Sequence, residues 1–95
     1  MVTEIAQITV AKGNEAAFAK AMREDGGIAH LSACAGVLTV RFGQGVESSS
    51  KFAFVVEWDS VEAHAAAKES DNFKAFSKLI QPWGIGGMME HFQLA

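Results

Sequence analysis

Hydrophobic and polar residues alternate in four short segments of the chain. Alternation with a period of two is typical of β-strands whose two faces have different surroundings. The polar stretch 44–50 separates the second and third segments and predicts that these two strands form a hairpin. The four predicted strands are residues 3–10, 36–43, 51–59 and 87–94.

Two longer segments lie between the strands and have apolar residues three or four positions apart, as in helices. The first covers residues 14–33. We expect the glycine pair at 26–27 to break it, because each glycine costs about 1 kcal/mol relative to alanine in a helix. The second begins at Asp59, restarts at Ser70, a residue type favoured as an N-cap, and ends before Pro82.

The order of elements is strand, helix, strand, strand, helix, strand. Two helices that cover one face of a four-stranded antiparallel sheet make the ferredoxin-like α+β fold, and we expect residues 1–95 to form one domain of this class. The other face carries a mixture of apolar and polar residues, so we expect a homodimer that buries it against a second copy. The residues expected there are Ile5, Gln7, Thr9, Val37, Thr39, Arg41, Val55, Glu57, Met89, His91 and Gln93.

Composition and charge exclude several classes of function. The net charge is −3 and the eight basic residues are scattered, so we expect no nucleic-acid partner. No apolar run approaches the roughly 20 residues that span a bilayer, and no signal peptide is visible, so we expect no membrane partner. The single cysteine, Cys34, cannot form an internal disulfide, and the three histidines match no metal-binding spacing. These features predict a cytoplasmic protein without a metal site.

The junction between the third strand and the second helical segment carries the strongest chemical signal. Trp58 ends the strand, and His64 follows within the first turns of the helix. Trp58 is either a core aromatic or a pocket wall whose indole N–H orients a substrate. His64 is either a surface or half-buried residue with no chemical role or, if it faces the same cleft, a base with a near-neutral pKa.

The fourth strand adds a carboxylate and a second histidine. The alternation predicts that Glu90 faces the helices with Met88 and Phe92, where a carboxylate must be paired or protonated. His91 is then expected to point into the dimer interface, in a structural hydrogen bond.

A further set of motifs spans essentially the whole chain: the first strand with KGNEAAF, then GVLTVRFG, EWDSVEAH, SDNFKAF and the terminal MEHF. Together these motifs resemble the antibiotic-biosynthesis monooxygenase family of dimeric α+β barrels. The resemblance implies a ferredoxin-like protomer that dimerises into a barrel. The family includes cofactor-free quinol and polyketide oxygenases as well as haem-degrading enzymes.

The resemblance transfers unevenly to individual residues. Trp58 falls on the strand-end tryptophan that lines the pocket of the cofactor-free oxygenases, and His64 falls where they carry a tyrosine. Phe54 replaces their pocket asparagine, and Gly43 replaces a histidine. The haem-degrading branch has a helix histidine, a helix tryptophan and a first-strand asparagine that this chain lacks, so no haem or other cofactor is expected. The replacing residues are Ser77, Ala67 and Ala6.

The resulting hypothesis is a monooxygenase that uses neither metal nor flavin and acts on a small electron-rich aromatic, such as a hydroquinone or a polyketide. His64 is the expected base and Trp58 the expected orienting donor. One alternative is a non-catalytic dimeric barrel that binds a small hydrophobic molecule, and another is an isomerase or decarboxylase of small metabolites. The residues expected to bind the substrate are Phe42, Phe54, Phe73, Phe76, Glu90 and Phe92.

Overall fold

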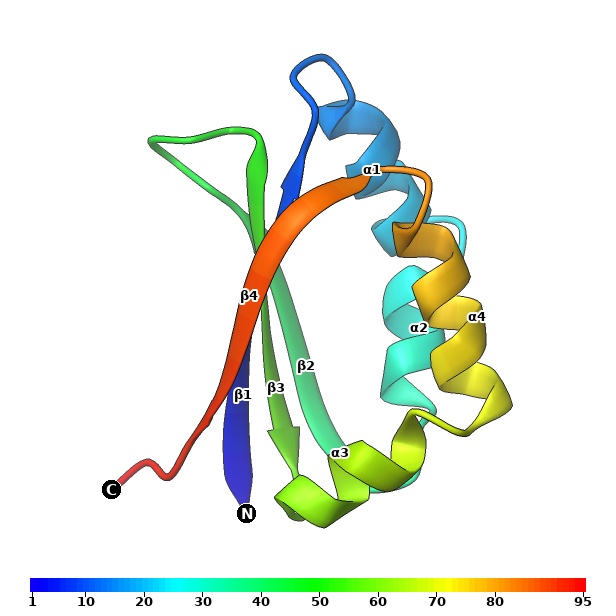
Figure 1. Ribbon diagram of the computed structural model, residues 1–95, viewed down its shortest axis with the longest axis vertical. Coiled ribbons are helices and arrows are strands. Elements are labelled where there is room, and N and C mark those ends of the chain that lie inside the picture. The colour runs from blue at the N-terminus through cyan, green and yellow to red at the C-terminus, as the bar shows by residue number, and fades with distance from the viewer.

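The computed structural model describes residues 1–95 and has one sheet with helices on one side only (Figure 1). The four strands are antiparallel, in the order β2-β3-β1-β4, so the first and third strands lie in the centre. The predicted ferredoxin-like α+β order is therefore confirmed. The elements are β1 (Val2–Val10), α1 (Glu15–Arg23), α2 (Gly27–Ser32), β2 (Val37–Gln44), β3 (Lys51–Trp58), α3 (Val61–Ala67), α4 (Asp71–Ile80) and β4 (Gly84–Phe92).

Each helical segment is divided in two, as the sequence predicts. Gly26 adopts a left-handed backbone with φ of 103°, which ends the first helix and lets α2 begin in a new direction. In the second segment, the Ser70 hydroxyl accepts a hydrogen bond from the Phe73 backbone N–H and caps α4. The start of α3 is one residue later than expected, because Ser60 rather than Asp59 is its N-cap.

The core lies between the helices and the face of the sheet that carries Ala6, Ile8 and Val10. Trp58, Phe18 and Phe52 are its largest fully buried side chains. Phe18 and Phe52 pack with Phe42 under α1, where the Phe42 and Phe52 rings stack at 5.5 Å. The opposite face of the sheet has no helix over it and exposes apolar side chains, with Ile5 39% accessible.

Two strands differ from their predicted form. In β2 the pairing with β3 shifts between Val37 and Thr39, so Leu38 is half exposed and Val37 packs against the core instead. A bulge of this kind reverses which residues face inward on either side of it. The fourth strand starts earlier than residue 87, because the glycine-rich segment from Gly84 pairs with β1 and is not a loop.

The two faces of β4 are the reverse of the prediction: residues expected to face the helices face outward, and His91 faces the helices. His91 pairs with Glu4 on the helix side of the sheet, while Glu90 pairs with the outward-facing Ile5. In β4, apolar residues occupy both odd-numbered and even-numbered positions, so alternation alone did not distinguish the two faces of the strand. The expected positions of Glu90 and Phe92 toward the helices, and of His91 toward a dimer interface, are therefore wrong.

Candidate functional site

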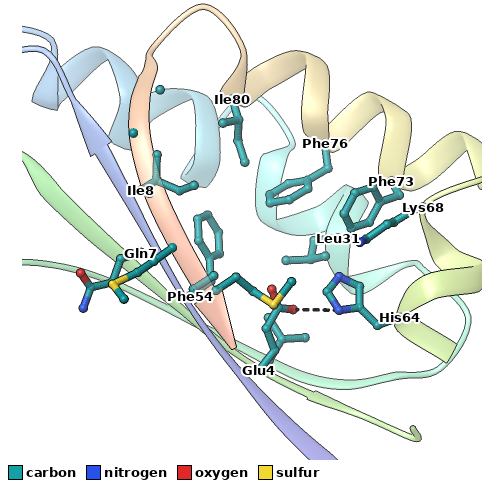
Figure 2. Close-up of a pocket in the computed structure, with 17 residues that line it drawn as sticks. Glu4, Gln7, Ile8, Leu31, Phe54, His64, Lys68, Phe73, Phe76 and Ile80 are labelled. Atoms are coloured by element: carbon teal, nitrogen blue, oxygen red, sulfur yellow. Dashed lines mark ion pairs between the residues drawn. The ribbon is translucent and has the colours of Figure 1, made fainter. Parts of the chain in front are cut away.

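A cavity of about 480 Å³ lies between the helix side of the sheet and α4 (Figure 2). Seventeen residues line it, and ten of them are hydrophobic. Phe73 and Phe76 point down into it from α4, and Phe54 points up from β3. Phe73 and Phe76 are three residues apart, a spacing that places both rings on the same face of α4.

His64 lies at one end of this cavity. Its position in the first turns of α3, capped at Ser60, places the ring against Trp58 at the end of β3. The two rings stack with centroids 4.4 Å apart, and His64 is only 3% accessible. Its Nδ1 is occupied by protein contacts, whereas no hydrogen bond within the protein uses Nε2. Every fully buried side-chain nitrogen or oxygen in the structure has a hydrogen-bond partner. Nε2 has none, so it is not fully buried, and it retains access to the cavity that His64 lines.

Glu4 is a buried carboxylate beneath His64. Its Oε1 accepts a hydrogen bond of 2.9 Å from the indole N–H of Trp58. The same oxygen lies 3.7 Å from Nδ1 of His64, the ion pair marked in Figure 2. A buried carboxylate requires such partners, because an isolated charge is costly away from water. Trp58 therefore holds the carboxylate in place beside the imidazole, and its only polar atom is not available to a substrate.

His91 completes the group from the edge strand β4. Its Nε2 lies 2.7 Å from Nδ1 of His64, within hydrogen-bonding distance. When His64 carries its proton on Nδ1, that proton is donated to His91 and the lone pair on Nε2 faces the cavity. Three residues from three elements, Glu4, His64 and His91, thus form one continuous polar cluster. Glu4 and His64 line the mostly apolar cavity, and His91 contacts His64 without lining it.

Burial is the largest influence on the charge of His64. It lowers the pKa of His64 below its ordinary value of 6.5, since the imidazolium is poorly solvated in the pocket. The carboxylate of Glu4 opposes this shift, while the nearby His91 and Lys68 add to the lowering. The net result is a pKa below 6.5, so His64 is neutral at pH 7 and able to accept a proton.

The structure brings together only part of the predicted site. His64, Phe54, Phe73 and Phe76 line the cavity, as expected. Trp58 is completely buried behind His64 and does not line it.

The other three predicted residues lie elsewhere. Phe42 belongs to the aromatic cluster under α1, with the Arg23 guanidinium 5.1 Å from its ring centroid. Glu90 and Phe92 are exposed on β4 and do not line the cavity.

Sequence reasoning missed two members of the polar cluster. Glu4 shares its strand face with Ala6 and Ile8, so a charged residue on an otherwise apolar face was the available signal. His91 was noticed but assigned to the wrong side of β4. No group of three His, Cys, Asp or Glu residues is arranged to hold a metal ion, and no helix is long and apolar enough to cross a membrane.

Solved structures show that other proteins share this fold. A Bordetella bronchiseptica protein assigned by name to the antibiotic biosynthesis monooxygenases has a TM-score of 0.86 at 24% identity, over 99% of this chain and 96% of that one. A similarly named protein from Nitrosomonas europaea has a TM-score of 0.80 at 16% identity, over 98% and 97%.

A further match is SnoaB from Streptomyces nogalater, a cofactor-independent oxygenase crystallised as its N63A mutant. Its TM-score is 0.79 at 15% identity, with coverage of 98% of this chain and 91% of that one. At these identities the structures establish the shared fold. Among proteins with curated functions, none matches the chain closely enough to count as a relative.

The sequence itself carries the family assignment. A family model described as antibiotic biosynthesis monooxygenase matches residues 1–79, which include β1, β3, α3 and most of α4. The match therefore covers Glu4, Trp58 and His64, and it ends before His91. This chain belongs to the antibiotic biosynthesis monooxygenase family.

Proposed function

We propose that this protein is a cofactor-independent monooxygenase of small electron-rich aromatic compounds, of the hydroquinone or polyketide type. The observation that carries the proposal is His64, a buried and neutral imidazole whose Nε2 has access to an apolar cavity. A base of this kind can remove an acidic phenolic or benzylic proton. The cofactor-independent oxygenase SnoaB, which has the same fold, supports the reaction class.

The reaction begins with proton transfer from the substrate to Nε2 of His64. The charge that develops on the imidazole is compensated by Glu4, 3.7 Å from Nδ1. His91, 2.7 Å from the same nitrogen, can accept the Nδ1 proton and pass its own toward solvent, because His91 is only half-buried. The Trp58 hydrogen bond to Glu4 makes Trp58 a positioning residue and not the substrate donor.

The substrate anion then reacts with O₂ in the cavity. It gives one electron to O₂, and the resulting radical and superoxide combine into a peroxide bonded to carbon. For a CH₂ group between two aromatic rings, protonation and loss of water leave a carbonyl group. Both C–H bonds are broken, one oxygen atom enters the product, and the other leaves as water with both hydrogens. The chain's part is to orient the ring, exclude water and hold the proton.

A His64 side chain in bulk solvent, together with a Trp58 that no cavity touches, would favour the non-catalytic alternative. The burial of His64 at the cavity end favours the enzyme, although Trp58 itself lies behind the cavity wall. A pocket lined by aliphatic and aromatic side chains alone could bind a guest but could not exchange a proton with it. The Glu4–His64–His91 cluster provides that exchange.

The test is O₂ uptake with model hydroquinones and an anthrone. We expect His64→Gln to reduce kcat by about 10²–10⁴-fold, the usual contribution of a general base. Trp58→Phe removes the hydrogen bond to Glu4 and is expected to reduce kcat less. The control is His30→Gln, because His30 contacts Asn72 on α4 and does not line the cavity. Equal activity of the His64→Gln protein and the wild type would eliminate the proposed base.

A further inference from the structure

Lys68 is the one lysine or arginine among the residues that line the cavity. It is four positions after His64, at the end of α3, and this spacing places both side chains on the same side of the helix. Figure 2 shows its amine directed toward the cavity from the side of α3 and Phe73. A cation thus stands within the same pocket as the proposed base.

The structure shows no partner for this cation. The ion pairs of the chain join Lys20 to Asp25 and His64 to Glu4, and Lys68 takes part in neither. The only other charged residue of the cavity wall is Glu4, whose carboxylate is engaged by Trp58 and His64. Lys68 is therefore an exposed cation without an ion-pair partner, at the edge of a mostly apolar pocket.

We propose that Lys68 is the recognition site for an anionic group on the substrate, so that this enzyme acts on aromatic acids. An aromatic ring among Phe54, Phe73 and Phe76 would leave a carboxylate substituent free to pair with the Lys68 ammonium. The reacting position would then face Nε2 of His64, one helical turn away. This inference deepens the proposed function, since it uses the same pocket and names the substrate class.

The experiment compares two probes of nearly equal shape, 2-naphthoate and 2-naphthamide, by calorimetric titration of the wild-type protein at low salt. The charged probe is expected to bind about fivefold more tightly than the neutral one, because an ion pair at an exposed site is worth up to about that factor. Lys68→Gln should abolish the difference, and Lys68→Arg should retain most of it. The binding of 2-naphthamide should change little in either variant.

Lys74→Gln is the matched control, since Lys74 is an exposed lysine of α4 that does not line the cavity. It alters the net charge by the same amount and should leave the preference intact. Equal binding of the two probes to the wild type, no binding of either, or an equal loss in the Lys68→Gln and Lys74→Gln proteins would overturn the proposal.

Oxygen uptake separates this inference from the proposed function. If naphthoate binds through Lys68 but no aromatic acid supports O₂ uptake, the monooxygenase proposal fails and the recognition site stands. If turnover occurs, Lys68→Gln should raise KM for acidic substrates much more than KM for neutral ones. A fall in kcat for acidic and neutral substrates alike would instead assign Lys68 to stabilising the reacting anion and would overturn the recognition role.

Discussion

Replacement of Glu4 by glutamine tests the centre of the proposed mechanism. The amide has nearly the same shape as the carboxylate, and its oxygen can still accept the 2.9 Å hydrogen bond from Trp58. The fold should therefore be retained. The negative charge 3.7 Å from Nδ1 of His64 is lost, and this charge matters only when the imidazole is protonated.

The size of the effect follows from that distance. Two unit charges 3.7 Å apart attract by about 4 kcal/mol at an effective dielectric constant of about 20. Each 1.4 kcal/mol corresponds to a factor of ten in rate, so the full attraction is worth about three orders of magnitude. The amide dipole retains part of the attraction, and we expect kcat to fall about 100-fold in the Glu4→Gln protein.

Two measurements check this result. The first is kcat for O₂ uptake, with Glu62→Gln as a control, because Glu62 is an exposed carboxylate on α3 outside the cavity. The second is NMR titration of the His64 ring, which needs no substrate. Loss of Glu4 removes the one contribution that raises the His64 pKa, so this pKa should fall further. A Glu4→Gln protein with kcat within threefold of wild type, or with an unchanged His64 titration, would refute the reasoning.

Three further predictions concern a glycine, the titration of His64 and the open face of the sheet. Gly36→Ala should cost about 2 kcal/mol of unfolding free energy in denaturant titrations, since φ is +90° and the new Cβ would lie 2.7 Å from Ala63 Cβ, whereas Gly43→Ala meets nothing and should be neutral. Because the pKa of His64 is lower in the folded protein than in the unfolded chain, the unfolded chain binds more protons below pH 6.5. The free energy of unfolding should therefore be highest above pH 6.5 and fall as the pH decreases. His64→Gln should flatten this pH dependence. Ile5→Lys should dissociate the expected homodimer in sedimentation equilibrium, whereas Val46→Lys, in an exposed loop, should not; a wild-type monomer at micromolar concentration would contradict the dimer.

The main elements of the fold could be predicted because local patterns and tertiary structure agree. The alternation in β1 and β3, the glycines at 26–27 and the Ser70 cap each specify their element from neighbouring residues. The β2 bulge at Leu38 could not be predicted, because it depends on how β2 pairs with β3. The bulge is a property of the assembled sheet and has no local signature.

The candidate site was predictable only where one element determined the direction of a side chain. Helical spacing placed Phe73 and Phe76 in the cavity together, and the strand period placed Phe54 opposite them. The polar cluster depends instead on register between β1 and β4, which pairs Glu4 with His91 across the sheet. A one-residue error in that register moves every side chain of the strand to the other face, as happened for Glu90.

The cavity itself originates in the glycines of β4. Gly84, Gly86 and Gly87 line it, and a Cβ on Gly84 would lie 3.3 Å from Ile80 and 3.5 Å from Ile8. A larger residue there would fill the space between the sheet and α4. Glycine weakens a strand, yet this segment keeps its pairing with β1, where Gly87 is opposite Ile8. The glycine end of β4 thus leaves room for a bound molecule, and the opposite end places His91 within hydrogen-bonding distance of the base His64. One edge strand therefore contributes to both the volume and the chemistry of the pocket.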